Sequence, residues 1–417
     1  MKTTLSKISW ILYDFANSAY HLLIITVLFP ICFKKGLYAH LSNSDALWSI
    51  FISIPILLSG IIAPFIGAYI DRTKKKTIFF VVTCILTAIM TTLLGFIPFT
   101  LPSIAVFTFC LSVLFFNLSQ FVYNAFLPTQ INQKGLATLS GTGWGVGYLG
   151  GILCMPIVFA FIKESSLPAD YNNYQTSFII VALYYILFSI PSLLFMKDQY
   201  SNDLGQTSTD NPIKTVFKTL SNWSQNKEIF KFLFAFYLIN DGLSTLVFFT
   251  SIFASSTLKM STSEIMKAFL IVQAVGIPST IALCWISERI GYKKVLMGTV
   301  ILWIFNSIAF LVVKSAFDLY ILSISVGLVI GTTPALARAI LALMIDKDNI
   351  SEIYGLHALT GRISSIFGPL LFGIVSSVTN NQTIAMSSLL LFFICGLIVL
   401  KNIDIVNFTK EDQVSNT

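Results

Sequence analysis

The sequence predicts an all-α membrane protein with twelve transmembrane helices in two pseudo-symmetric six-helix bundles. Three observations support this fold class. Hydrophobic residues make up 55% of the 417 residues and charged residues 11%, and the mean hydropathy is +0.82. Apolar stretches long enough to cross roughly 30 Å of hydrocarbon recur along almost the whole chain. A short polar pattern also occurs twice, about half a chain apart.

The apolar stretches are expected to form helices. Backbone N–H and C=O groups in lipid must be satisfied within the protein, and these stretches are too long and too uniformly apolar for barrel strands. Hydropathy predicts spans at roughly 5–33, 45–70, 77–98, 101–124, 138–162, 174–196, 229–255, 263–287, 292–313, 317–343, 350–377 and 381–402. We interpret the first span as a retained helix and not as a cleaved signal peptide, because it contains Asp14, Asn17 and His21.

The two sets of six spans divide the chain into four segments. We expect an N-terminal bundle in residues 1–196, a cytoplasmic linker in residues 197–228, a C-terminal bundle in residues 229–402 and a cytoplasmic tail in residues 403–417. Within the linker, Val216, Phe217, Leu220 and Trp223 keep helical spacing opposite Lys214 and Lys218. This pattern fits an interfacial helix and a solvated linker helix equally.

The distribution of Lys and Arg predicts the orientation. One set of loops, which includes Arg72, Lys74 and Arg289, holds roughly three times as many basic residues as the other set. The positive-inside rule places these loops, the linker and both termini in the cytoplasm. The expected location is a bacterial inner (cell) membrane. The net charge of +7 is spread over short loops, so no nucleic-acid partner is expected. The six cysteines show no CxxC spacing, so neither disulfides nor a metal or other cofactor is expected.

Polar side chains within the predicted spans are candidates for solute handling. A charge at the centre of a membrane helix costs at least about 2.5 kcal/mol on insertion scales, so such residues are functional candidates by default. On the first and seventh spans they form helical stripes that should face a shared central cavity. The candidate substrate-binding or coupling residues are Asp14, Asn17, His21, Asn117, Gln120, Asn124, Asn240, Asp241, Thr245 and Arg362.

Several of these residues also have structural interpretations. Asp14 fits an interhelical hydrogen-bond acceptor as well as a group that handles solute or protons. Arg362 fits a fixed partner of Asp14 or Asp241 as well as a ligand for a substrate anion. His21 fits a packing residue or a proton relay. We expect Asp14 or Asp241 to change protonation during the transport cycle, because burial favours the neutral form of a carboxyl group.

The repeated polar pattern lies in a tight turn between two apolar runs. Its first copy reads GAYIDRTKKK over residues 67–76, and its second reads CWISERIGYKK over residues 284–294. Each copy has an acidic residue before an arginine, and a basic cluster follows. The residues expected to form a cytoplasmic gate are Gly67, Asp71, Arg72, Lys75, Lys76, Glu288, Arg289 and Arg338. Asp71 and Glu288 are expected to accept helix N-terminal amides or to pair with arginines, and Arg338 fits a structural or gating partner of Glu288.

Small residues recur at a four-residue period in the fifth and eleventh spans. The sets are Gly143, Gly147 and Gly151 in the fifth span, and Gly361, Ser365, Pro369 and Gly373 in the eleventh. This spacing allows two helix backbones to approach closely, and it fits static packing or helices that slide during transport.

The repeated pattern resembles the signature of the major facilitator superfamily, Gly-x-x-x-Asp-Arg-x-Gly-Arg-Arg/Lys. In the first copy Gly67, Asp71, Arg72, Lys75 and Lys76 match, and Lys74 replaces the second glycine. The second copy keeps the acidic residue, the arginine, the second glycine at Gly291 and Lys293, but Cys284 replaces the first glycine and Tyr292 a basic residue. We therefore expect the Asp71 side of the gate to be the stronger one.

A narrower resemblance connects the chain with the autophagy-related vacuolar effluxer family and its bacterial members. It rests on WILYDFANSAY at residues 10–20, YNAFLP at 123–128, SGTGWGVGYLGG at 140–151 and INDGLST at 239–245. In that family a Gly-Gly-x-Gln-Ala-Leu-Ser-Arg-Ser-like stretch occurs in the tenth helix, whereas here residues 331–339 keep Arg338 and lack the glutamine and the serines. The resemblance implies amino-acid efflux, and this difference implies another substrate if those polar groups touch it.

We therefore predict a secondary active transporter, a symporter or antiporter, that moves a small polar solute by alternating access. An amino acid or related metabolite fits the charges of both signs, and protons are the expected coupling ion. The expected partners are this solute and the lipid bilayer, and the protein is expected to be a monomer. The alternatives are a sensor or scaffold with a transporter fold, or a membrane enzyme, which is disfavoured because His21, His40 and His357 form no HxxxD or HExxH pattern.

Overall fold

The protein is all-helical over the part of the chain that its computed structural model describes. These residues are 2–33, 37–38, 44–98, 100–131, 133–161, 171–197, 211–221, 224, 226–345, 349–364 and 367–405. His40, Trp223, Ser365, residues 198–210 of the linker and residues 406–417 of the tail lie outside them.

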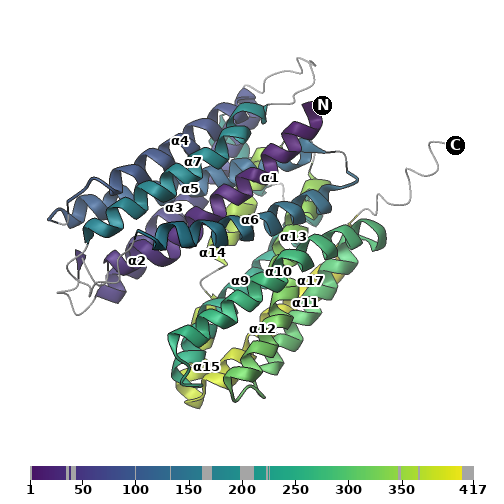
Figure 1. The fold of residues 1–417 in the computed structure, drawn as a ribbon. Helices are drawn as coiled ribbons and strands as arrows, with labels where there is room; N and C mark the ends of the chain where they lie inside the picture. The colour runs from purple at the N-terminus through teal and green to yellow at the C-terminus, as the bar shows by residue number, and fades with distance from the viewer. Residues whose placement is uncertain are drawn as a thin grey trace. The chain divides into compact units, whose positions relative to one another are not determined.

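The first half of the chain contains the helices up to the linker (Figure 1). They are α1 (Lys2–Tyr20), the π-helical η1 (His21–Leu28), α2 (Phe29–Cys32), α3 (Ser44–Thr73), α4 (Lys76–Leu94), α5 (Pro102–Gln130), α6 (Leu136–Phe159), α7 (Tyr171–Phe195) and the short α8 (Pro212–Ser221) in the linker.

The second half repeats this plan with more interruptions. Its helices are α9 (Lys227–Ser256), α10 (Thr262–Ile290), α11 (Tyr292–Ala309), α12 (Ala316–Ile330), α13 (Thr332–Met344), α14 (Ile350–Ile363), α15 (Phe367–Thr379), α16 (Gln382–Ser388) and α17 (Leu390–Lys401).

Eleven helical stretches of the described chain are long and apolar enough to cross a membrane. The remaining expected span, 292–313, corresponds to α11, which has 18 residues and begins next to Lys293 and Lys294. Large apolar side chains are exposed along single helix faces, as on α7, where the exposed residues are Leu183, Leu187, Ile190 and Leu194. Such faces are typical of helices that contact lipid.

Four of the expected continuous spans consist of two or more helical segments, and prolines explain three of the interruptions. Proline has no N–H and its ring clashes with the carbonyl four residues earlier. Pro334 therefore acts on Ile330, where α12 ends. Pro30 follows η1 at the start of α2, and Pro369 lies in the first turn of α15, just after the break from α14. The last span is divided at Leu389, between α16 and α17.

The chain forms two compact units, each of which takes residues from both halves of the sequence. The first unit comprises residues 1–130, 146–216 and 348–359, and the second comprises residues 131–145, 217–347 and 360–417. The helices α6 and α14 therefore each contribute one segment to each unit.

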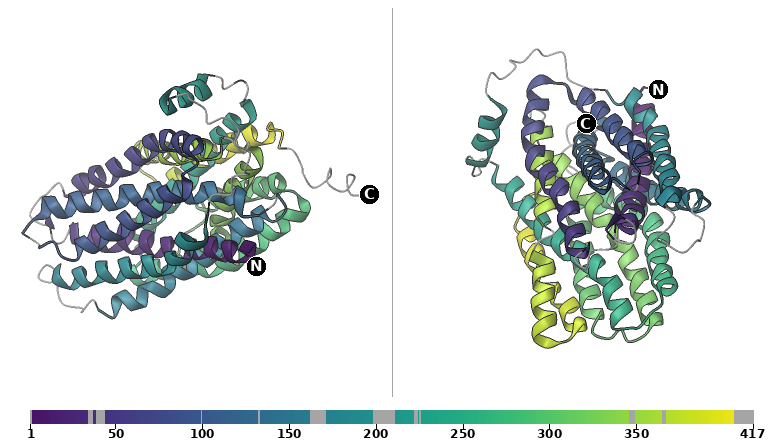
Figure 2. Two further views of the ribbon diagram at one scale, coloured as in Figure 1. Left: turned by 90° about the horizontal axis from the view of Figure 1, so that it is seen from above. Right: turned by 90° about the vertical axis from the view of Figure 1, so that its left-hand side faces the viewer.

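Aromatic packing fills the core of the first unit. The helix pairs α4–α5, α1–α7 and α3–α5 make its most extensive contacts, and Figure 2 shows these purple to teal helices running side by side. Phe29 and Phe109 stack with ring centroids 3.9 Å apart, and Tyr13 contacts Phe80, Tyr123 and Tyr185. In the second unit, α10 packs on α12 and α9 on α17, and Trp303 stacks on Phe393.

Candidate transport and gate sites

Asp71, at the end of α3, caps the N-terminus of α14 in the first unit. Its Oδ1 accepts the N–H of Ser351 at 3.0 Å, and its Oδ2 accepts the N–H of Glu352 at 2.9 Å. The first N–H groups of a helix have no partner within the helix and carry partial positive charge, so a carboxylate stabilises them. The amide contacts expected for Asp71 are therefore present.

Two glycines allow α3 and α14 to approach closely enough for this cap. A Cβ at Gly67 would lie 2.2 Å from the carbonyl oxygen of Ser351. On the other helix, a Cβ at Gly355 would lie 2.6 Å from the carbonyl oxygen of Ala63. Any side chain at either position would push the two backbones apart, since real contacts of this kind are longer than 3 Å.

The basic cluster after Asp71 contains residues in three different environments. Lys76 is buried, donates from Nζ to the carbonyl oxygen of Ala125 at 3.1 Å and lies over the ring of Phe126. Lys75 is exposed. Lys74 replaces the signature's second glycine and has φ 55°, in the left-handed region that favours glycine. The glycine of the signature at this position is thus explained by the left-handed backbone conformation that the turn requires.

Glu288, at the end of α10, makes the corresponding contact with α6 in the second unit. Its Oε2 accepts the N–H of Gly135 and its Oε1 accepts the N–H of Thr138, both at 3.0 Å. Tyr292, which replaces a basic residue of the signature, donates its hydroxyl to Oε2 of Glu288 at 2.5 Å. The tyrosine thus replaces a charge of the first copy with a hydrogen bond to the carboxylate.

Arg338 adds a second attachment of α6. It is buried on α13, where its Nε donates to Ser140 Oγ and its Nη2 to the carbonyl oxygen of Ser140, both at 3.0 Å. The same Oγ donates to the carbonyl oxygen of Ala335 at 2.7 Å. Arg289 lies 3.9 Å from the ring centroid of Trp285. Ser140, which the sequence analysis did not select, is therefore the main described partner of Arg338.

The two copies differ in the glycines that allow close helix approach. In the first copy each helix has one, Gly67 on α3 and Gly355 on α14. In the second copy Cys284 stands in place of Gly67, and the space is provided by Gly141 on α6, where a Cβ would lie 2.5 Å from Cys284 Cβ. On the Glu288 side, Tyr292 and Arg338 supply hydrogen bonds where signature residues are lost. The stronger role of the Asp71 side stays a prediction.

The small-residue sets differ in detail from the expectation. On α6, Gly141 and Gly145 face α10, whereas Gly147 and Gly150 face α1, with a Cβ at Gly150 lying 2.1 Å from the carbonyl oxygen of Phe15. In the eleventh span, a Cβ at Gly373 would have nothing within 4 Å and one at Gly361 only a ring atom of Phe236 at 3.9 Å. The close approaches there are made by Gly355 and Gly368 instead.

The polar stripe of the first span lies in the first unit. Asn17 Nδ2 donates to Asp14 Oδ1 at 3.1 Å, and both residues are buried. His21 is exposed at the change from α1 to η1. On α5, Asn117 is buried and donates to the carbonyl oxygen of Val113 at 2.8 Å, while Gln120 and Asn124 are half-buried.

A network of buried hydroxyls lies beside this stripe and was missed by the sequence analysis. Tyr13 OH is 2.6 Å from Ser119 Oγ and 3.1 Å from Tyr185 OH. Tyr20 OH is 2.6 Å from Ser112 Oγ. The signal in the sequence was the seven-residue spacing of Tyr13 and Tyr20, which places both rings on one face of α1.

The polar stripe of the seventh span lies at the break between α14 and α15, in the second unit. Asp241 Oδ1 accepts the N–H of Gly368 at 2.9 Å. Asn240 Nδ2 donates to Ser364 Oγ at 2.6 Å and to the carbonyl oxygen of Gly361 at 3.4 Å. Arg362 lies in the last turn of α14, within two residues of these acceptors along the chain. The structure therefore brings Asn240 and Asp241 together with the ends of two helices.

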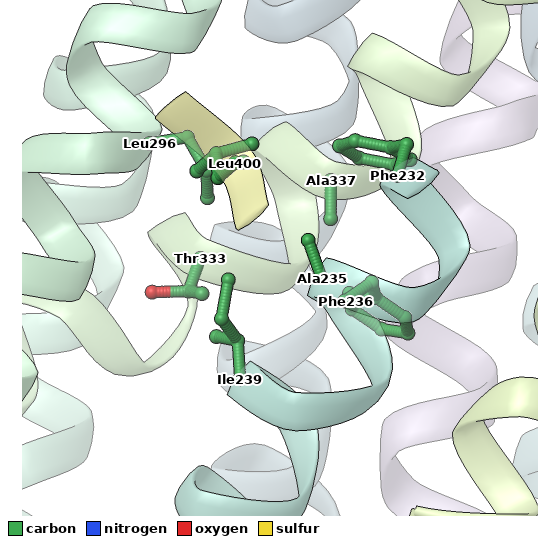
Figure 3. A pocket seen from close by; sticks show the side chains of 8 residues that line it. All are labelled: Phe232, Ala235, Phe236, Ile239, Leu296, Thr333, Ala337 and Leu400. Atoms are coloured by element: carbon green, nitrogen blue, oxygen red, sulfur yellow. The ribbon is translucent and has the colours of Figure 1, made fainter. Parts of the chain in front are cut away.

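An apolar gap lies farther along α9 towards its start. It is too narrow to hold a water molecule and is lined by the residues labelled in Figure 3, which are Phe232, Ala235, Phe236, Ile239, Leu296, Thr333, Ala337 and Leu400. The hydroxyl of Thr333 already bonds Trp303 Nε1 at 3.0 Å and the carbonyl oxygen of Val329. This gap therefore offers no polar group to a solute, unlike the Asn240–Asp241 region.

A comparison of the sequence with known families identifies the family of this chain. The family model "Vacuole effluxer Atg22 like" matches residues 37–413. The chain belongs to this family. Among relatives of the family, it is 26% identical over 417 residues to the uncharacterized MFS-type transporter YxiO of Bacillus subtilis, covering 98% of this chain and 97% of that one. It is 23% identical to Autophagy-related protein 22 of Kluyveromyces lactis, covering 90% and 82%.

Solved structures show the fold of this Atg22-like protein. The transporter FucP in its outward conformation superposes with a TM-score of 0.75 at 13% identity, covering 97% of this chain and 99% of FucP. The proton:xylose symporter XylE gives a TM-score of 0.71 at 10% identity, covering 97% and 95%. The predicted major facilitator fold is therefore confirmed, and the chain is a multi-pass membrane protein of a transporter family.

Proposed function

We propose that this protein is a secondary active carrier that moves a small polar solute, an amino acid or a related metabolite, by alternating access and with protons as the coupling ion. The observation that carries the proposal is that both copies of the repeated turn place a carboxylate on a helix N-terminus, Asp71 on α14 and Glu288 on α6. A scaffold would have no need of two such interruptible contacts.

These caps fit the role of a cytoplasmic gate. Only contacts that differ between two conformations can shift the balance between them. A cap on an N-terminus is such a contact, because the amide donors and the carboxylate can both be hydrated after separation. The caps would therefore hold one conformation until solute and protons bind.

The choice of solute follows from charge and from the relatives. Asp14, Asp241 and Arg362 offer both signs of charge, which suits a zwitterion. The name "vacuole effluxer" describes the family as exporters. The altered stretch at residues 331–339 keeps Arg338 and lacks the glutamine and serines, and it favours a substrate different from that of the fungal relatives if those polar groups touch substrate there. We also propose the N-terminal bundle 1–196, the linker 197–228, the C-terminal bundle 229–402, cytoplasmic termini, an inner-membrane location and a monomer.

The test is solute counterflow in proteoliposomes that contain the full-length protein. Labelled amino acids and related metabolites are offered one at a time, after a thermal-shift screen has selected the compounds that stabilise the protein. A carrier exchanges its solute saturably, whereas a sensor or scaffold binds the compound without counterflow.

Asp71→Asn is the variant that probes the gate in this assay. Asparagine can accept only one of the two amide hydrogens, so we expect slower counterflow with solute binding retained. Wild-type counterflow rates, together with unchanged cysteine accessibility, would contradict the gating role of Asp71.

A further inference from the structure

Arg289, the arginine of the second copy of the repeated turn, stacks on a tryptophan one turn earlier on α10. Its Cζ atom lies 3.9 Å from the centroid of the Trp285 ring. Cation–π attraction favours this position, and stacking holds the planar guanidinium group in one orientation. The residue that corresponds to Trp285 in the first copy is Ala68, which is buried. The stacked pair is therefore a feature of the second copy alone.

Trp285 and Arg289 lie on the outward face of a membrane-spanning helix. Trp285 is 47% exposed, and Arg289 is exposed as well. The exposed line continues along α10, at steps of three or four residues, through Ala282, Pro278 and Ala274. On the opposite side of the helix, Thr280 and Ser287 are 0% exposed. Because α10 is apolar and long enough to cross a membrane, its exposed side contacts lipid.

The pair lies at the depth of the lipid headgroups. The helix α10 ends at Ile290, so Trp285 is about 7.5 Å and Arg289 about 1.5 Å from the helix end at a rise of about 1.5 Å per residue. Tryptophan is enriched where the hydrocarbon meets the headgroups, and arginine side chains near helix ends extend into the headgroup layer. Trp285 can therefore contact the upper part of an acyl chain while Arg289 reaches a phosphate.

The guanidinium group of Arg289 has donors to offer to such a phosphate. Among the described residues, its one interaction is with the ring of Trp285. The adjacent Glu288 directs its oxygens to backbone N–H groups of α6 and to the hydroxyl of Tyr292. Lys294, five residues after Arg289, is exposed and adds a second positive charge. This end of α10 therefore presents positive charge beside an apolar helix face.

We propose that Trp285 and Arg289 form a binding site for an anionic phospholipid. The guanidinium group donates two N–H groups to phosphate oxygens, the indole packs on the glycerol and the upper acyl chain, and the chain lies along the small side chains of the exposed line. A zwitterionic headgroup fits less well, because it carries a cation that Arg289 and Lys294 repel. The proposal does not depend on the carrier function, because lipid binding can be measured without transport.

The experiment is quenching of tryptophan fluorescence by brominated lipids, with the full-length protein in proteoliposomes. Two preparations contain equal parts of phosphatidylglycerol and phosphatidylcholine, and the bromine atoms are on the chains of phosphatidylglycerol in one and of phosphatidylcholine in the other. Surface charge and bromine content are thus identical. Trp285 is one of six tryptophans, so its signal is obtained by subtracting the spectrum of Trp285→Phe, which keeps an aromatic ring beneath Arg289.

We expect brominated phosphatidylglycerol to quench Trp285 more strongly, because a basic residue at the membrane surface enriches an anionic lipid roughly fivefold. Arg289→Gln should remove the difference between the two preparations, while Trp285 stays quenched in both. Lys401→Gln is the matched control, since it removes the same charge from the end of another helix, α17, where Lys401 is exposed. It should leave the difference unchanged.

Four results would overturn the proposal. Equal quenching of Trp285 in the two wild-type preparations would show that the site does not select an anionic lipid, and no quenching in either would mean that another protein surface covers this face. Both results come from the wild-type protein and from Trp285→Phe, so they hold even if Arg289→Gln does not fold. A difference that persists in Arg289→Gln would assign the attraction to other charges. Loss of the difference when inorganic phosphate replaces chloride at constant ionic strength would assign the site to a soluble anion.

Discussion

A single hydrogen atom at position 67 decides how closely α3 and α14 approach. Gly67→Ala would place a methyl group 2.2 Å from the carbonyl oxygen of Ser351. Overpacking of this kind costs about 1–3 kcal/mol, so we expect a lower apparent melting temperature of the purified protein. The matched control is Gly298→Ala on α11, where a Cβ would meet nothing within 4 Å and helix propensity favours alanine. Equal melting temperatures for the two variants would show that the approach is not tight.

The pair Gly141 and Cys284 offers a test of the close packing between α6 and α10. Gly141→Ala alone should destabilise the second unit, because its methyl group would collide with the side chain of Cys284. Adding Cys284→Gly removes this collision and leaves only the carbonyl oxygen of Thr280, 2.9 Å from the new methyl group, as a close contact, so the double variant should be more stable than Gly141→Ala. A double-mutant cycle by thermal unfolding measures this coupling, which we expect at about 0.5–3 kcal/mol. Additive effects would mean that the two residues act independently.

At the scale of helices, the cap of Glu288 on α6 should control access to Cys284. Glu288→Gln can accept only one amide hydrogen, and the loss of a cap costs about 1 kcal/mol, or roughly a fivefold change in an equilibrium constant. Because Gly141 of α6 covers the buried Cys284, opening of α6 should raise the alkylation rate of this thiol about fivefold. The measurement uses a protein in which Cys284 is the remaining cysteine, with maleimide as the reagent.

This alkylation measurement has a matched control variant on the same helix. Thr142→Val on α6 is the control, because the Thr142 hydroxyl bonds only the carbonyl oxygen of Thr138 among its described contacts and its loss should leave the alkylation rate unchanged. An alkylation rate for Glu288→Gln equal to that of the parent protein would show that the cap does not hold α6 closed.

The helix breaks show which part of the fold the sequence could predict. Hydropathy located the spans, because apolar length is a property of consecutive residues. It could not divide them, since the few small or polar residues at the breaks, such as Thr332 and Thr333 after Gly331 and Ser387 and Ser388 before Leu389, form stretches too short to end an apolar span. Pro334 and Pro369 were the available signals for two of the breaks, and they were not used because membrane helices often tolerate proline.

The site was predictable by residue type but not by pairing. Asp14, Asn17, Asn240 and Asp241 were found because polar residues are rare and costly in apolar spans. Asp241 contacts the backbone of Gly368, over a hundred residues later in the chain. This contact depends on the path of the chain between the two residues, so it leaves no local pattern in the sequence. Likewise, the contact between Gly141 and Cys284 could not be predicted from the second copy of the turn alone, because Gly141 lies on another helix.

At the scale of the whole molecule, the remaining question is how the proton gradient drives solute movement, and Asp241→Asn addresses it. Asparagine imitates the neutral acid, so the cycle steps that need a protonated site should continue and solute exchange should persist. Accumulation driven by a proton gradient should be lost, because residue 241 can no longer release a proton. Parallel counterflow and accumulation assays in proteoliposomes separate the two, and Asp14→Asn is the comparison, since Asp14 is held by Asn17 in the other unit. Full proton-driven accumulation by Asp241→Asn would exclude Asp241 as the coupling residue and leave Asp14 as the remaining candidate.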